Sequence, residues 1–127
     1  MSSFIFIIAG AFGGKLKHLT ATELATHSTI AALAEANLPG SKVDETFFGN
    51  VIQSSLDAAY LARHVALKSG APVASPALTI NRLCGSGFEA VCLGAEAIEL
   101  QRANVTLCGG TENMSQCPMT IDGYDMQ

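Results

Sequence analysis

Four short stretches of the chain are rich in apolar and β-branched residues and lie next to turn-forming residues. They span residues 4–9, 46–52, 77–81 and 104–109. Runs of this length and composition predict buried β-strands. Between them lie longer stretches whose apolar residues recur every three or four positions, and this spacing predicts one helix in each interval.

The first two helices have recognisable ends. The first begins at the capping box Thr20-x-x-Glu23 and stops before Pro39. In such a box the two side chains satisfy free backbone donors of the first turn. The second follows two serines at residues 54–55, which can act as N-caps, and ends at residues 70–72, where glycine and proline occur.

The third helix begins at residues 85–86 and carries small or apolar residues on several sides. Its expected apolar face carries Phe88, Val91, Cys92, Ala95 and Ile98. Small residues elsewhere around it predict a helix that is packed closely and buried. The order βαβαβαβ predicts an α/β fold with a mainly parallel sheet and a buried helix after the third strand.

Composition narrows the possible functions. Hydrophobic residues make up 49% of the 127 positions and charged residues only 14%, as in a single domain whose elements are covered on both faces. The seven lysines and arginines are scattered and the net charge is −4. We therefore expect no nucleic-acid partner.

Neither the cysteines nor the N-terminus suggests a metal site, a disulfide scaffold or a membrane span. The four cysteines form no CxxC pair and have no histidine at ligand spacing, so we expect free thiols and no metal. The apolar run near the N-terminus is much shorter than the roughly 20 residues that span a bilayer. No basic residue precedes this run, so a buried strand is favoured over a signal peptide, and no clear transit peptide is seen.

The most informative stretch is residues 81–87, which reads as a strand end, a turn and a helix start around Cys84. The positive end of the helix dipole favours a thiolate there, and the neighbouring glycines let a bulky group approach. By these features alone a nucleophile and a buried structural cysteine are equally favoured. Gly85-x-Gly87-x-x-Ala90 also fits a dinucleotide-binding turn, although no acidic residue ends the next strand.

The histidines offer no convincing base. His18, His27 and His64 lie in or beside the first two helices, where a partly exposed residue is the simpler interpretation. No Ser/His/Asp set or paired carboxylate occurs at useful spacing.

Two motifs in the correct order, Asn81-Arg-Leu-Cys84-Gly-Ser-Gly87 and Gly109-Gly-Thr-Glu-Asn-Met-Ser115, resemble the acyl-binding cysteine motif and a later loop of the thiolase family. The similarity runs from about residue 10 to residue 118. Residues 49–57 and 60–65 further resemble the mitochondrial 3-ketoacyl-CoA thiolase branch (acetyl-CoA acyltransferase) more than the biosynthetic branch.

The resemblance implies an acyltransferase of fatty-acid β-oxidation, located in mitochondria and oligomeric when complete. Cys84 would carry the acyl group as a thioester, with coenzyme A as a substrate and no bound cofactor. Met114 would bind substrate, and Glu112 and Ser115 would lie near the acyl pocket. For these three residues, loop capping or packing is the competing interpretation.

The chain also departs from the family pattern. Its first nine residues replace the usual Arg-Thr-Pro-x-Gly stretch, and Cys117 stands where the family's loop often has a small residue. The family's Gly-His-Pro, Cys-x-Gly-Gly-Gly and Asn-Glu-Ala-Phe motifs are absent from residues 1–127. We therefore expect a partial N-terminal domain over 1–127, without loop region or C-terminal half, and poorly active alone. The alternative is a non-catalytic fragment that binds acyl groups or associates with a full-length thiolase.

Overall fold

A computed structural model describes residues 7–126 and contains a three-stranded parallel sheet. Its strands are β1 (Glu45–Gly49), β2 (Ala77–Ile80) and β3 (Thr106–Gly110), in the order β2-β1-β3. β1 pairs with both neighbours, so the carboxyl ends of all three strands lie at one edge of the sheet. This arrangement confirms the prediction of an α/β fold with parallel strands.

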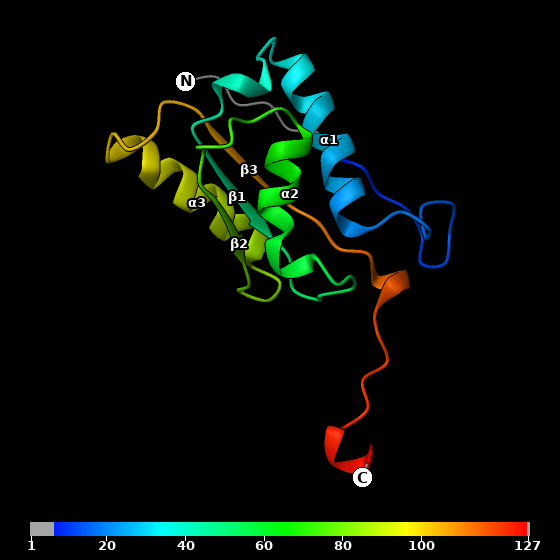
Figure 1. The fold of residues 1–127 in the computed structure, drawn as a ribbon. Helices are drawn as coiled ribbons and strands as arrows, with labels where there is room; N and C mark the ends of the chain where they lie inside the picture. Colours follow the sequence, from blue (N-terminus) through cyan, green and yellow to red (C-terminus); the bar gives the residue numbers. More distant parts are fainter. Residues whose placement is uncertain (1–6, 127) are drawn as a thin grey trace.

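Three helices cover the two faces of this sheet. They are α1 (Ala21–Glu35), α2 (Leu61–Lys68) and α3 (Ser86–Glu99). α1 and α2 lie on one face and α3 on the other, which gives three layers (Figure 1). Residues 117–126 extend away from these layers. Within residues 7–126, no helix combines the length and the apolar character that crossing a bilayer requires.

Two predicted strands differ from the structure. Of the first, expected over 4–9, residues 4–6 lie outside the described part of the chain, and residues 7–9 have no regular structure. The second was expected to reach residue 52, but β1 ends at Gly49. The reason is a long-range contact, because the backbone N–H groups of Val51 and Ile52 donate to the Glu112 carboxylate rather than to another strand.

The start of α1 is as predicted. The Thr20 hydroxyl accepts a hydrogen bond from the Glu23 N–H at 3.1 Å, and the Glu23 carboxylate accepts one from the Thr20 N–H at 2.7 Å. The Thr20 N–H and hydroxyl both donate to the Glu23 carboxylate, and these two hydrogen bonds lower the pKa of Glu23. The sequence therefore encodes this helix start locally, through one pair of side chains.

The start of α2 was predicted too early. The serines at 54–55 do not cap it, and residues 58–60 form a short 3-10 turn before the helix begins at Leu61. The Ser55 hydroxyl instead donates to Asp57, and the Ala62 N–H in the first turn of α2 donates to the Thr79 hydroxyl on β2. A contact with β2 therefore helps fix the start of α2, and Leu56, which precedes the helix, is fully exposed.

Consecutive residues of β1 build the two halves of the core. Phe48 packs with Leu61 and Val65 between the sheet and the α1/α2 layer. Phe47 belongs to the cluster on the α3 side, with Ala90 and Ala97 of α3. Because side chains alternate along a strand, one of these two phenylalanines packs on each face of the sheet.

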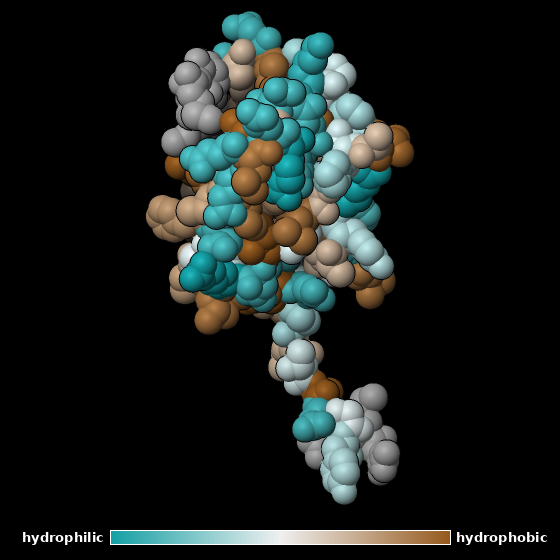
Figure 2. All heavy atoms as spheres, turned by 90° about the vertical axis from the view of Figure 1, so that its left-hand side faces the viewer, coloured by the Kyte–Doolittle hydropathy of each residue, from teal (hydrophilic) through white to brown (hydrophobic). Residues whose placement is uncertain are grey.

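α3 is buried on one side only, which corrects the prediction of a buried helix. Its inner face is made of Ala90, Gly94 and Ala97. A Cβ at Gly94 would stand 2.2 Å from the Cys108 sulfur, so glycine is required for this close approach. The predicted apolar face points outward instead, with Phe88 81% and Val91 58% exposed. Figure 2 shows hydrophobic side chains at the surface on this side of the molecule.

Candidate functional site

Cys84 lies in the tight turn between β2 and α3. Its side chain is exposed, and it precedes Gly85, the N-cap residue of α3. The residue before it, Leu83, has a φ of 51°, in the left-handed region that a leucine rarely occupies. Such backbone strain is most often found at functional sites, where surrounding structure holds it.

Two side chains hold this turn. The Ser86 hydroxyl accepts a hydrogen bond from the Arg82 N–H at 2.8 Å and donates to the Leu83 carbonyl at 2.6 Å. The Asn81 carboxamide oxygen accepts from the Leu83 N–H at 3.1 Å. Ser86 is itself buried, so the turn that presents Cys84 is anchored from beneath.

Cys84 faces an open pocket of about 670 Å³ at the carboxyl edge of the sheet. Its walls come from the segments that follow β1 and β3 and from the start of α3, and they consist of Gly49, Val51, Ile52, Leu83, Cys84, Ser86, Gly87, Gly110, Thr111, Glu112 and Met114. Ligands of open parallel sheets generally bind at this edge. The structure therefore brings the predicted residues Cys84, Glu112 and Met114 to one pocket.

Glu112 lines the pocket and also caps the backbone opposite it. Its carboxylate accepts hydrogen bonds from the N–H groups of Val51 and Ile52, each at 3.0 Å, and from the Asn50 carboxamide at 2.8 Å. The loop-capping interpretation from the sequence is therefore correct for this residue, although its carboxylate also forms part of the pocket wall.

Met114 sits in a loop that is anchored at several points. The Asn113 carboxamide donates to the carbonyls of Lys17 and Leu19, and the Ser115 hydroxyl accepts from the Gly13 N–H at 2.9 Å. Met114 itself is 53% exposed and lines the pocket. Ser115 thus serves to join two loops and is not among the lining residues.

The other three cysteines lie in different environments. Cys92 is exposed on the outer face of α3. Cys108 lies under α3, where burial raises its pKa. Cys117 is half-buried, and its sulfur lies 3.9 Å from that of Met114. The described residues contain no cluster of three or more metal-ligating side chains.

None of the three histidines lines the pocket. His18 and His27 are exposed. His64 Nδ1 lies 2.8 Å from a carboxylate oxygen of Asp57, and its ring stacks on Tyr60. The hydrogen bonds from Ser55 and His64 lower the pKa of Asp57. This pair stabilises the segment before α2 and is separate from the Cys84 pocket.

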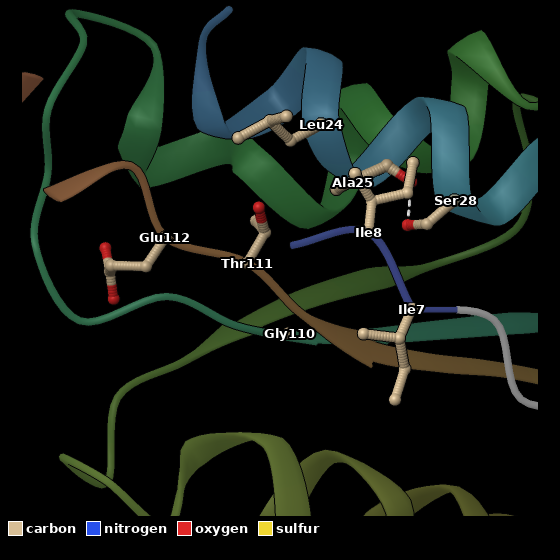
Figure 3. Close-up of a pocket in the computed structure, with 8 residues that line it drawn as sticks. All are labelled: Ile7, Ile8, Leu24, Ala25, Ser28, Gly110, Thr111 and Glu112. Atoms are coloured by element: carbon tan, nitrogen blue, oxygen red, sulfur yellow. Dashed lines mark hydrogen bonds between the residues drawn. The ribbon is translucent and has the colours of Figure 1, made fainter. Parts of the chain in front are cut away.

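A smaller hollow of about 210 Å³ lies on the other side of the β3 carboxyl end (Figure 3). It is formed by Ile7 and Ile8 against α1 and shares Gly110, Thr111 and Glu112 with the Cys84 pocket. Among the described residues that line it, Glu112 is the one titratable group. In Figure 3 the Glu112 side chain points away from the two isoleucines.

Sequence reasoning missed the wall formed by Val51 and Ile52. These residues had been assigned to a strand, where their role in a site is hidden. The available signal was positional, since the ends of parallel strands meet at one edge and Gly49-Asn50 ends the strand beside the one that leads to Cys84.

Comparison with known proteins identifies the family. A model described as the thiolase N-terminal domain matches residues 5–125. This chain belongs to the thiolase family. The resemblance inferred from the cysteine motif and the later loop is thereby confirmed.

Individual thiolases agree with this assignment. The chain is 50% identical to human mitochondrial 3-ketoacyl-CoA thiolase over 123 residues, which cover 92% of the chain and 31% of that protein. It is 40% identical over 114 residues to the acetyl-CoA acetyltransferase of Cupriavidus necator, covering 90% of the chain and 29% of that thiolase. The chain thus spans about a third of the length of these curated relatives.

Solved thiolase structures share the fold. Human mitochondrial 3-ketoacyl-CoA thiolase in complex with CoA superimposes with a TM-score of 0.89 at 48% identity, over 98% of this chain and 31% of that one. The acetyl-CoA acetyltransferase of Bacillus anthracis gives a TM-score of 0.83 at 35% identity, over 95% of this chain and 32% of that one. The α/β arrangement described above is therefore that of a thiolase N-terminal region.

Proposed function

We propose that Cys84 is the acyl-accepting nucleophile of a thiolase that cleaves 3-ketoacyl-CoA. The observation that carries this proposal is the place of Cys84, exposed in a strained turn at the start of α3 and facing a pocket at the carboxyl edge of the sheet. Met114, on the opposite loop, is the proposed contact for the acyl chain. The similarity to mitochondrial 3-ketoacyl-CoA thiolases supports a mitochondrial location and a role in β-oxidation.

The proposed chemistry has two steps. The Cys84 thiolate attacks the 3-keto carbon, the bond between C2 and C3 breaks, and the acyl group remains on sulfur as a thioester. The departing enolate of acetyl-CoA takes up a proton. The thiol of free CoA then attacks the thioester carbonyl, releasing the shortened acyl-CoA and restoring Cys84. Coenzyme A is thus a substrate, in keeping with a relative solved in complex with CoA.

A positioned general acid or base contributes about 10²–10⁴ in rate and one oxyanion donor about 10²–10³. Residues 1–127 contain none of the family's Gly-His-Pro, Cys-x-Gly-Gly-Gly or Asn-Glu-Ala-Phe motifs. For the isolated chain we therefore expect slow acylation of Cys84 and no thiolysis at an enzyme-like rate. We propose that efficient turnover needs those groups, in an oligomer of complete subunits.

Acylation and turnover are measured separately. The chain is incubated with acetoacetyl-CoA, and peptide mapping locates hydroxylamine-labile acetyl groups, with Cys84→Ala as the blank and Cys92→Ala as the matched control. We expect the thioester on Cys84 in the unaltered chain and in Cys92→Ala. Equal acetylation of Cys92 would contradict the assignment of Cys84 as nucleophile. Rapid, Cys84-dependent loss of acetoacetyl-CoA with free CoA would contradict the need for the other motifs.

A second candidate is a binding role without turnover. The exposed apolar residues Phe88 and Val91 on α3 favour association with another protein surface, including that of a full-length thiolase. A dinucleotide-binding role has less support, because Glu112, the first acidic residue after β3, has its carboxylate engaged by three donors of residues 50–52.

A further inference from the structure

Glu112 is the acceptor for a set of donors that come from a distant part of the chain. Its carboxylate accepts hydrogen bonds from Asn50 Nδ2 at 2.8 Å and from the backbone N–H groups of Val51 and Ile52 at 3.0 Å each. Sixty or more positions separate it from these partners. Figure 3 shows its side chain directed toward the loop that follows β1. One side chain therefore joins two segments that are remote in sequence.

These hydrogen bonds begin where the sheet ends. The last link between the two strands is the bond from the Thr111 N–H to the Gly49 carbonyl at 3.0 Å. Beyond it, the buried Asn50 donates through Nδ2 to both the Thr111 carbonyl and Glu112. The carboxylate thus continues the connection between β1 and β3 into the segments that form the pocket.

Both joined segments are walls of the Cys84 pocket. Val51 and Ile52 line one wall, and Thr111, Glu112 and Met114 line the other. Within residues 7–126, the N–H groups of Val51 and Ile52 both donate to Glu112. Hydrogen bonds to an ionised acceptor are about twice as strong as neutral ones, so this carboxylate has a large share in setting the distance between the walls.

On the far side, the loop that carries Met114 is tied to the N-terminal segment. Asn113 is buried, and its carboxamide donates to the carbonyls of Lys17 and Leu19. Met114 therefore directly follows Glu112 and Asn113, two residues whose side chains are each held by a separate part of the chain. A shift at Glu112 would move Met114 relative to Cys84.

We propose that Glu112 is a positioning residue of the acyl site. It holds the wall of Val51 and Ile52 against the wall of Met114, and so determines how an acyl chain fits in front of Cys84. This role is distinct from proton transfer or from contact with the reacting atoms. The inference rests on the proposed function of Cys84 as acyl acceptor.

The test uses a chain-length-dependent probe on the 127-residue protein. Modification of Cys84 by N-octyl iodoacetamide is followed against probe concentration, which separates the half-saturation concentration from the limiting rate. Iodoacetamide, which carries no chain, reports the reactivity of Cys84 alone, and Cys92 in the same sample reports a thiol outside the pocket. The variants are Glu112→Gln, Glu112→Asp and the control Asp44→Asn.

Asp44 provides a matched control within the same sheet. Its carboxylate accepts hydrogen bonds from the backbone N–H groups of Asn104 and Val105, so it also links the region of β1 to that of β3, but at the opposite end of the strands. Asp44→Asn removes the charge from the same kind of contact without touching the pocket. A general loss of stability would weaken binding of the octyl probe in both Asp44→Asn and Glu112→Gln. A change confined to the pocket would weaken it only in the Glu112 variants.

For Glu112→Gln we expect the half-saturation concentration of the octyl probe to rise about tenfold, the equivalent of about one hydrogen bond to a charged acceptor. The limiting rate and the reaction with iodoacetamide should stay within about twofold, because the Cys84 turn is held separately by Ser86. The half-saturation concentration of Glu112→Asp should fall between those of the unaltered chain and Glu112→Gln. That of Asp44→Asn should equal the value of the unaltered chain.

The outcomes separate this inference from the proposed function. Saturation in the unaltered chain with no change in Glu112→Gln, or an equal change in Asp44→Asn, would overturn the role of Glu112 alone. Absence of saturation in the unaltered chain would overturn the acyl pocket and, with it, this inference. If Glu112→Gln does not fold, Glu112→Asp decides, with hydrogen exchange of the Val51 and Ile52 amides as the local readout. Faster exchange there together with weaker probe binding supports the proposal, and unchanged values of both oppose it.

Discussion

The two helices that flank Cys84 in sequence differ in what they present to solvent. α2 buries Leu61, Ala62 and Val65 completely. Its Lys68 is exposed, whereas Arg63 is half-buried and its guanidinium donates to two backbone carbonyls. α3 buries Ala90 and Ala97 as completely, yet its outer side carries Phe88 and Val91. The inner faces are therefore equivalent in burial, while the outer faces differ in chemistry.

This difference shows which surface of the chain is suited to contact with water. The exposed side of α2 combines Lys68 with one partly exposed apolar residue, Leu67, and so needs little further cover. A helix that is apolar on both sides is typical of the interior of a larger assembly. The Cys84 turn opens directly into α3, so the candidate active site lies at the edge of the less polar surface.

The largest expected effect comes from truncating the inner face. Leu61→Ala removes a fully buried side chain from the cluster with Phe48 and Val65, and should lower the free energy of unfolding by about 2–5 kcal/mol. Phe88→Ala on the outer face of α3 should change it by no more than about 0.5 kcal/mol, because Phe88 is 81% exposed. Urea denaturation of both variants measures the difference. Similar losses in the two would mean that Phe88 is covered in solution.

Association is the next effect, and it distinguishes the two outer faces directly. We expect the unaltered chain to self-associate at micromolar concentration through the apolar outer face of α3. Phe88→Ser with Val91→Ser should weaken this association about tenfold or more, since burying one large apolar side chain contributes about 1.5–3 kcal/mol. Leu67→Ser, at the exposed apolar position of α2, is the matched control. Light scattering that shows a monomer throughout would contradict the expectation.

The sequence predicted the position of α3 well, but it did not show which face of the helix turns toward the sheet, and the reason is physical. The turn glycines and the apolar spacing defined the helix, but Ala90, Gly94 and Ala97 are as regularly spaced as Phe88, Val91 and Ala95. Small and large residues alike therefore predict burial. The structure selects the smaller ones because α3 approaches β3 closely, with no room for a Cβ at Gly94. Apolar size does not indicate direction when both sides of a helix are apolar.

The candidate site shows the same division between local and long-range information. Cys84 could be found from the sequence, because its turn is encoded within residues 81–87. The wall of Val51 and Ile52 could not, since it depends on hydrogen bonds to Glu112 some sixty positions away. The strand predicted through residue 52 hid it, because an apolar, β-branched pair favours a strand and nothing nearby shows the competing acceptor.

Thiol reactivity compares the two sides of α3 within one molecule. Cys84 and Cys92 are exposed, whereas Cys108 lies on the inner side, where burial raises its pKa. We expect limiting iodoacetamide to modify Cys84 first, Cys92 more slowly and Cys108 last, with peptide mapping as the readout. Cys84 leads because its turn combines exposure with adjacent glycines. Modification of Cys92 or Cys108 as fast as Cys84 would contradict this order.

The smallest expected effect is a pH dependence of stability that arises under α3. Burial raises the pKa of Cys108 above its ordinary value of 9.0, so the folded chain holds this proton at a pH where the unfolded chain releases it. The folded state then binds more protons than the unfolded state, and the free energy of unfolding falls as pH rises. The contribution is fully present below about pH 9 and is lost as the pH rises through the folded pKa. Urea denaturation from neutral to alkaline pH should show this fall diminished in Cys108→Ala. The fall should be retained in Cys92→Ala, which removes an exposed thiol from the outer side of α3. Equal slopes in the two variants would mean that the inner side of α3 is as open to water as the outer side.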